Sequence, residues 1–199
     1  MTRTRIWVKP EGAEFVAAEL GRDRLSASGT AVGADPMPYR LTYELATTGR
    51  WVTSRLVVET SGADPATGPW RRRLELGNRD GEWTAAVEAE GTPDLPPPGG
   101  DVAALSGALD CDLGLSPLTN TMPVLRAGLL DGGGPVEFLM AWVSVPDLAV
   151  VPSRQTYTFV SGGADHSVVR YASPGFTREV VFDPDGLVRD YPGIGRAVG

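Results

Sequence analysis

Residues 109–130 read LDCDLGLSPLTNTMPVLRAGLL and carry the clearest helix signal in a chain that otherwise alternates like β-structure. Between residues 121 and 130 the one charged side chain is Arg126, and the apolar side chains point in every direction around a helical turn of about 3.6 residues. Such a helix is stable only where other parts of the chain surround it. The segment therefore predicts a short, buried helix.

Pro123 determines where this helix starts. Proline inside a helix costs about 3 kcal/mol, but in the first turn its missing N–H would have no partner anyway. We therefore expect the helix to begin at Asn120 or Thr121, capped by one of these side chains, and to end at Gly128 or in residues 131–134. About ten residues, roughly 15 Å, are too few for a helix to persist alone in water. Packing against a sheet must stabilise it.

Turn signals recur through the rest of the chain, at residues 48–49, 80–81, 161–163 and 183–186, and favour an antiparallel meander. Residues 39–45 and 83–87 alternate apolar and polar side chains, as in strands with one solvent-facing side. Residues 136–145 read VEFLMAWVSV and are apolar on both faces after Glu137, which indicates a strand covered on both sides. The predicted fold is mainly β (α+β), one large curved antiparallel sheet wrapped around one short central helix.

Chain length and composition favour one domain over residues 1–199. Residues 92–101 read TPDLPPPGGD, and the consecutive prolines indicate an extended segment. We interpret this segment as a surface loop that joins two halves of the domain, the alternative being a true domain boundary.

The charge balance bears on the partners. The chain has 25 acidic and 18 basic residues, a net charge of −7, which disfavours nucleic acid and anionic membrane surfaces. Arg71 and Arg73 alternate with Arg72, a pattern that suits the outer face of a strand, the alternative being a phosphate or partner contact. The N-terminal MTRTRIWVKPEG lacks the apolar core of a signal peptide, and no run approaches the roughly 18 apolar residues of a membrane span. We expect a cytoplasmic protein without stable membrane insertion, in agreement with a single cysteine, Cys111. The oligomeric state stays open.

Residues suited to catalysis are few. His166 is the one histidine and lies beside a turn, and Cys111 lies between two acids that disfavour its thiolate. Asp110 and Asp112 share one strand face and could divide acid and base roles. If Cys111 and Leu113 point into the core, these aspartates instead face water or cap the following loop. The sequence lacks motifs for nucleotide binding, metal binding and nucleophilic catalysis. We therefore expect a protein without a cofactor, a bound metal or enzymatic activity.

Three long segments carry a family resemblance: residues 109–129, residues 141–160 (AWVSVPDLAVVPSRQTYTFV) and residues 171–198 (YASPGFTREVVFDPDGLVRDYPGIGRAV). In this order they resemble the bacterial "putative glycolipid-binding" family, formerly a domain of unknown function. The resemblance implies a spiral β-roll, similar in shape to periplasmic lipoprotein carriers and to a mycobacterial lipid-carrying lipoprotein. It implies a lipid or glycolipid ligand by analogy of shape, and it supplies no catalytic residues.

The leading hypothesis is non-enzymatic binding of a glycolipid or another amphipathic lipid-like ligand between the sheet and the central helix. Arg178 shares a strand face with Phe176 and Val180, which indicates an internal ion pair, a rim position or a head-group contact. The predicted ligand-binding residues are Met122, Leu125, Arg126, Leu129, Phe138, Met140, Trp142, Arg154, Tyr157 and Arg178. One alternative is a structural or interaction module with a filled core, and another is an enzyme that uses Asp110 or Asp112.

Overall fold

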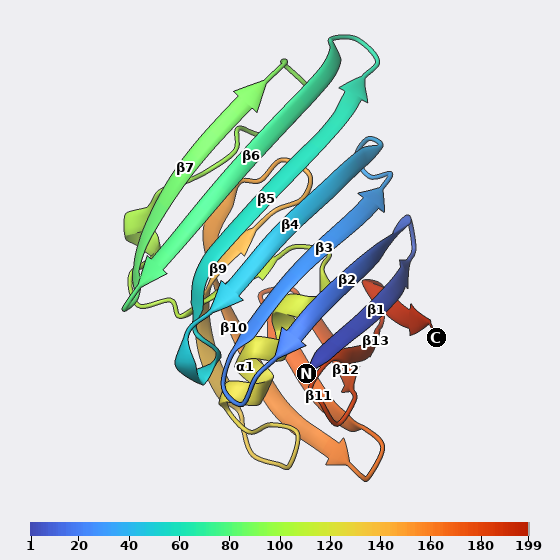
Figure 1. Cartoon of the computed structure of the whole chain (residues 1–199), viewed down its shortest axis with the longest axis vertical. Helices are drawn as coiled ribbons and strands as arrows, with labels where there is room; N and C mark the ends of the chain where they lie inside the picture. Colours follow the sequence, from blue (N-terminus) through green and yellow to red (C-terminus); the bar gives the residue numbers. More distant parts are fainter. Residues whose placement is uncertain (199) are drawn as a thin grey trace.

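The computed structural model describes residues 1–198 and consists mainly of β-strands (Figure 1). Over these residues 59% of the chain is strand and 9% is helical. The strands are β1 (Thr2–Lys9), β2 (Gly12–Leu20), β3 (Leu25–Gly33), β4 (Tyr39–Thr47), β5 (Thr53–Asp64), β6 (Gly68–Arg79), β7 (Glu82–Glu90), β8 (Asp110–Leu113), β9 (Val136–Val143), β10 (Val150–Gly162), β11 (Ser167–Ser173), β12 (Phe176–Phe182), β13 (Val188–Tyr191) and β14 (Gly195–Val198). The α-helix is α1 (Thr121–Arg126), and the 3₁₀ turns are η1 (Gly49–Trp51), η2 (Val102–Leu105) and η3 (Pro117–Asn120).

All fourteen strands in residues 1–198 belong to one sheet. The first and the last strand of the chain are neighbours in the middle of this sheet. The order is β7-β6-β5-β4-β3-β2-β1-β14-β13-β12-β11-β10-β9-β8. β1 pairs with β14, with Ile6 opposite Val198. β7 and β8, although consecutive in the chain, therefore form the two opposite edges of the sheet.

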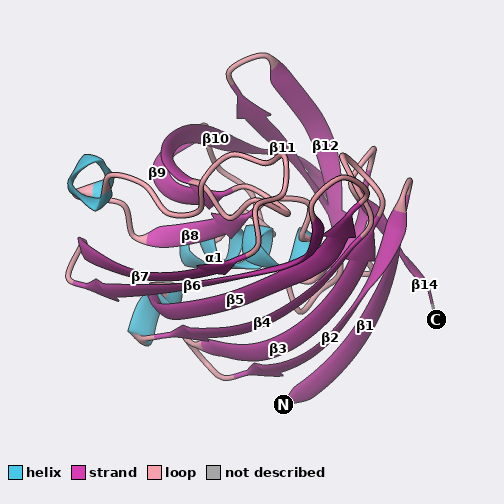
Figure 2. Cartoon of the chain, turned by 90° about the horizontal axis from the view of Figure 1, so that it is seen from above, coloured by secondary structure: helices cyan, strands magenta, loops and turns pink. Residues whose placement is uncertain are grey.

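The sheet rolls up around α1 without closing. Figure 2 shows α1 between the layer of β1 to β7 and the layer that contains β9 to β12. The chain that enters β8 contacts the other half of the sheet: the Thr53 N–H donates to the Leu109 carbonyl at 3.1 Å, and the Trp83 indole N–H donates to the Ala108 carbonyl at 2.9 Å. The predicted mainly β fold, a curved sheet around one short helix, is confirmed.

One pairing departs from the antiparallel prediction. β8 and β9 run parallel, with Cys111 opposite Ala141, whereas the other strand pairs are antiparallel. Parallel neighbours need a crossover connection. Here η3, α1 and the glycine-rich segment that follows α1 supply it. The predicted helix is thus the crossover that returns the chain to the starting end of β8.

α1 starts where Pro123 requires but is shorter than predicted. It begins at Thr121 and ends at Arg126, and Gly128 then adopts a φ of +66°, which glycine accepts without strain. The predicted cap is wrong, because neither Asn120 nor Thr121 caps the helix with its side chain. η3 runs directly into α1, so Asn120 already has helical backbone angles, and its side chain accepts a hydrogen bond from the Tyr157 hydroxyl at 3.0 Å.

The predicted burial of α1 and β9 is largely confirmed. Met122 and Val124 of α1 and Leu129 after it are completely buried, while Leu125 is half-buried. In β9, Met140 and Ala141 point to opposite faces and both are completely buried. Met122 and Val124 of α1 and Ala141 of β9 therefore belong to one core.

The alternating strands agree with the sequence prediction in the middle of the sheet and depart from it at the edge. In β4 the side chains of Tyr39, Leu41, Tyr43 and Leu45 are buried. In β7 Trp83 is buried, but Ala85 is exposed and Val87 is 43% exposed. The predicted buried face is wrong there, because β7 is an edge strand that the opposite half of the sheet does not cover.

The proline-rich segment 92–101 contacts both halves of the sheet. Arg72 of β6 is buried and donates to the carbonyls of Leu95 and Asp147, the latter at 2.8 Å. Gly99 pairs with Ala149, just before β10. Arg71 and Arg73, as predicted, lie on the outer face and form ion pairs with Glu59. Assignment of residues 1–199 to one domain stays a prediction.

Candidate functional site

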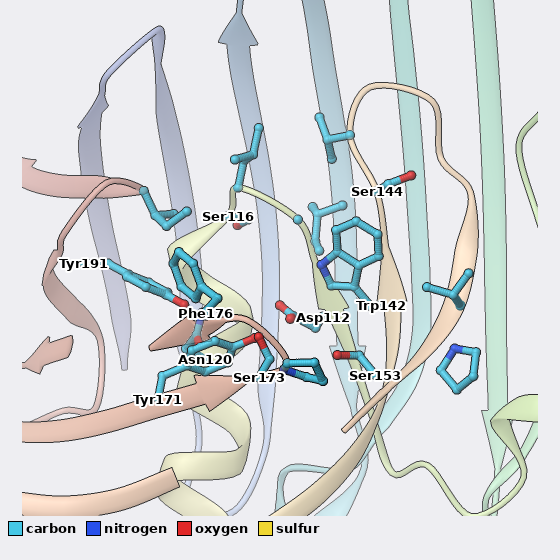
Figure 3. A pocket seen from close by; sticks show the side chains of 18 of the residues that line it. Asp112, Ser116, Asn120, Trp142, Ser144, Ser153, Tyr171, Ser173, Phe176 and Tyr191 are labelled. Atoms are coloured by element: carbon cyan, nitrogen blue, oxygen red, sulfur yellow. The ribbon is translucent and has the colours of Figure 1, made fainter. Parts of the chain in front are cut away.

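A cleft of about 520 Å³ opens on the inner side of the C-terminal half of the sheet (Figure 3). Its lining comes from β8 and the turn after it, from η3, from β9 to β13, and from the loop between β3 and β4. The rolled sheet brings these segments together, since they are spread from Asp35 to Ile194 along the chain.

Aromatic rings form two sides of the cleft. Tyr171 lies 5.9 Å from Phe176 and 5.9 Å from Tyr191, measured between ring centroids. Trp142 of β9 lies across the cleft from these three rings (Figure 3). Each ring is placed by a different strand, so the aromatic surface depends on the pairing of β11 with β12 and on the curvature of the sheet.

Asp112 lies between the aromatic sides and forms part of the floor (Figure 3). Its carboxylate accepts hydrogen bonds from the Thr119 hydroxyl at 2.9 Å and from the Gln155 amide at 2.6 Å. Burial raises the pKa of Asp112, and these two hydrogen bonds oppose the rise. No arginine or lysine among residues 1–198 forms an ion pair with it. The cleft thus contains a buried carboxyl group that lacks a cationic partner.

Asp110, on the same face of β8, is in a different environment. Both of its oxygens accept from the Arg126 guanidinium, one of them at 2.7 Å, and the side chain is completely buried. Burial raises the pKa of Asp110, and Arg126 opposes the rise. The expectation that Asp110 and Asp112 face water or cap a loop is wrong, because β8 is covered on both faces. Asp110 is not part of the cleft lining.

The turn after β8 presents an apolar side chain at the rim. Leu115 has a φ of +61°, a conformation that costs an L-residue about 1–2 kcal/mol. Its side chain lines the cleft and is 42% exposed. Val151 of β10 also lines the cleft and is 45% exposed. The rim therefore presents exposed apolar side chains beside the exposed Asp35, whereas the floor carries Asp112 and serine hydroxyl groups.

Cysteine and histidine lie outside the cleft. Cys111 is buried, and burial raises the pKa of its thiol to about 12, which leaves almost no thiolate at neutral pH. His166 is exposed in the turn between β10 and β11. Within residues 1–198 no group of three or more His, Cys, Asp or Glu side chains is arranged to hold a metal ion.

The predicted apolar ligand-binding residues are divided between the core and the cleft. Trp142 lines the cleft. Met122, Leu129 and Met140 are completely buried, and Leu125 is half-buried against Gly186. Phe138 packs edge-on against Tyr157, with ring centroids 5.7 Å apart, and the Arg126 guanidinium lies 5.1 Å from the centre of its ring. These five side chains do not line the cleft.

The predicted polar contacts also separate. Tyr157 is buried, and its single hydroxyl proton is shared between the Asn120 and Gln155 side-chain oxygens. Arg126 is bonded to Asp110, and Arg154 is exposed outside the cleft lining. Arg178 is exposed, and its guanidinium lies 4.4 Å from the centre of the Phe176 ring. Of the alternatives for Arg178, an internal ion pair is therefore wrong within residues 1–198, because the side chain lies at the rim beside Phe176.

Sequence reasoning missed the aromatic side formed by Tyr171, Phe176 and Tyr191. A local signal existed, since each of the three lies within three residues of a turn proline, Pro174 or Pro192. Such turns occur throughout the chain, however, and their convergence depends on the curvature of the sheet.

Comparison with known proteins gives two positive findings. The model of the family described as "Putative glycolipid-binding" matches residues 4–197. The crystal structure of a DUF1089 family protein from Pseudomonas aeruginosa is similar, with a TM-score of 0.68 and 28% sequence identity over 93% of this chain and 92% of that chain. A comparison with curated proteins found no match. No helix within residues 1–198 is both long and apolar enough to cross a bilayer. Because the family model covers nearly the whole sequence, the chain belongs to the "putative glycolipid-binding" family.

Proposed function

We propose that the cleft binds the sugar head group of a glycolipid without converting it chemically. The observation that carries this proposal is the combination of aromatic rings with a buried carboxyl group in one cleft. A sugar ring has apolar C–H faces that pack on aromatic rings and an edge of hydroxyl groups that donate to a carboxylate. The volume of about 520 Å³ lies in the range of roughly 300–1,000 Å³ typical of ligand sites.

The polarity of the cleft supports one orientation of the ligand. Polar groups line the floor, while Leu115 and Val151 are exposed apolar side chains at the rim. Leu115 also borders an adjoining cavity of about 190 Å³. In this orientation the head group enters the floor and the acyl chains leave over the rim. The ligand position proposed from sequence, between α1 and the sheet, is less favourable because Met122 and Leu129 fill that space.

A binding role is favoured over hydrolysis of the head group. Most glycoside hydrolases use two carboxyl groups that flank the reacting bond. Asp112 lines the cleft, but Asp110 is bonded to Arg126 and lies outside it. The candidate pair from the sequence is therefore divided. The other carboxyl group of the lining, Asp35, is exposed in the loop between β3 and β4.

The alternative of a structural or interaction module is favoured by one observation, the filled core around α1. It leaves the open cleft without a role. Native mass spectrometry after purification, followed by titration with a panel of glycolipids and phospholipids, distinguishes the two hypotheses. Bound glycolipid supports the proposal, and a failure of every glycolipid to bind favours the module.

A variant pair tests the location of the site. Trp142→Ala removes one aromatic side of the cleft and is expected to weaken glycolipid binding about tenfold or more. Phe15→Ala removes a ring that is 46% exposed on the outer surface of β2 and is expected to leave binding unchanged. Equal binding by both variants and the unmodified protein would place the ligand elsewhere. Cytoplasmic localisation stays a prediction from sequence, to be tested by cell fractionation.

A further inference from the structure

The charges that line the cleft are of one sign. Asp35 and Asp112 are the charged residues in the described lining, and arginine and lysine are missing from it. This negative charge acts on Tyr171: burial and then the nearby Asp112 raise the pKa of the Tyr171 hydroxyl to about 12. An anionic group placed in the cleft would therefore meet a negative potential in a partly desolvated setting.

Positive charges around the cleft are committed elsewhere or lie at its rim. Arg126 is bonded to Asp110, and Lys9 forms an ion pair with the buried Glu14 at 2.6 Å. Arg178 lies over Phe176 and donates to the carbonyls of Thr177 and Pro192. None of these three side chains neutralises Asp112.

Asp112 retains capacity for a ligand. Each carboxylate oxygen accepts one hydrogen bond, from Thr119 or Gln155, and a carboxylate has about four acceptor positions in all. Ionisation of this buried group is costly without a positive partner. A cationic ligand would supply that partner, and the surrounding rings would add cation–π attraction.

We infer that the cleft selects a head group that carries a protonated amine, such as an amino sugar, and that Asp112 is the residue that determines this specificity. The inference rests on the proposed function, because it names the class of head group that the same cleft takes. A neutral sugar makes the same stacking contacts, and its hydroxyl groups donate to Asp112 without neutralising its charge. A phosphorylated sugar is repelled.

Three alkyl glycosides with the same chain test this specificity by calorimetric titration at pH 7: an amino sugar, its N-acetyl form and its phosphate ester. The amino sugar is expected to bind at least tenfold more tightly than the N-acetyl form, with the phosphate ester weakest. Asp112→Asn should bring the amino and N-acetyl affinities within about twofold of each other. Asp80→Asn, a control in the exposed turn between β6 and β7, should leave the preference intact.

The pH dependence gives a second measurement on the unmodified protein, in case Asp112→Asn folds poorly. A trimethylammonium glycoside keeps its charge at every pH, so its affinity should rise with pH as Asp112 ionises, while the N-acetyl affinity should change much less. The titratable groups that act on Asp112 or line its cleft are Asp110, itself bonded to Arg126, and Tyr157, Tyr171, Tyr191 and Asp35; the nearest rim cation, Arg178, acts on Tyr191. Burial raises the pKa of all three tyrosines above their ordinary value.

The outcomes separate the inference from the function on which it rests. If the N-acetyl or phosphorylated glycoside binds as tightly as the amino sugar, the inference is overturned and the proposed function stands. If no glycoside or glycolipid binds at all, both fail. If the amine preference survives in Asp112→Asn, the amine is recognised by another group and Asp112 is not the determinant.

Discussion

Asp110 and Asp112 lie two residues apart on one face of β8, but their surroundings differ in kind. Asp110 is completely buried beside α1, and both of its oxygens are bonded to Arg126. Asp112 is held by Thr119 and Gln155, lacks a cation and borders an open cleft. β8 therefore marks the boundary between a filled region around α1 and an open region lined by aromatic rings. A carboxyl group acquires its role from the element packed against it.

The largest change in stability is expected from breaking the ion pair between Asp110 and Arg126 in the filled region. Arg126→Ala leaves the Asp110 carboxylate buried without its partner, which should lower the free energy of unfolding by about 3–5 kcal/mol. Denaturant unfolding measures the loss. The double variant Asp110→Ala with Arg126→Met removes both charges and should recover much of the stability. A loss below about 1 kcal/mol in Arg126→Ala would mean that the pair does not stabilise this region.

A second test compares side chains around α1. Leu129→Ala removes a completely buried side chain and should cost about 2–5 kcal/mol of unfolding free energy while leaving ligand affinity unchanged. Leu125→Ala, at a half-buried position, should cost less. Thermal unfolding and ligand titration on the same samples provide both readouts. A stable Leu129→Ala protein with altered ligand binding would instead support the hypothesis that the ligand binds between α1 and the sheet.

Substitutions in the cleft should have the opposite effect, lowering ligand affinity more than stability. Phe176→Ala removes a half-buried ring that contacts Tyr171, so ligand affinity should fall about tenfold, or about 1.4 kcal/mol, with a smaller loss of stability than in Leu129→Ala. Phe138→Ala is the matched control, because that ring packs on Tyr157 outside the cleft. Weakened binding in Phe138→Ala but not in Phe176→Ala would reverse the assignment of the two regions.

The smallest effect is expected at Asp112. Since its folded-state pKa is raised, Asp112 contributes stability that is present below its unfolded pKa and is lost as the pH rises through the folded pKa. Asp112→Asn should therefore stabilise the protein at pH 8 by about 1 kcal/mol, a Tm increase of about 2–4 °C, with no gain at pH 4. Melting curves across this pH range measure the difference. A lower Tm at pH 8 would show that the ionised carboxylate stabilises the fold.

Much of the fold was predictable because its signals are local. Pro123 placed the start of α1 at Asn120 or Thr121, and the helix begins at Thr121. The apolar faces of residues 136–145 indicated a strand covered on both sides, and in β9 Met140 and Ala141, on opposite faces, are completely buried. The failure of Asn120 to cap α1 could not be foreseen, because η3 gives that residue helical backbone angles and Tyr157, distant in sequence, bonds to its side chain.

The candidate site was predictable only in part, and the reason is physical. Trp142 belonged to the predicted ligand-binding residues and lines the cleft, but Tyr171, Phe176 and Tyr191 come from three other strands. Apolar spacing shows that a side chain faces inward and does not show whether the inside is filled. Met122 and Trp142 both face inward, yet one is completely buried and the other lines open space.

The amino-acid sequence was sufficient to determine the strands, the turns, the start of the short helix and the family. Hydrophobic periodicity, proline geometry and long motifs in a fixed order can all be read from consecutive residues. Tertiary structure alone decided which carboxyl group received Arg126 and which bordered a cleft. The environment of each carboxyl group depends on the curvature of the sheet, because that curvature sets which side chains face β8. The curvature in turn is set by the packing of side chains that lie far apart in the sequence.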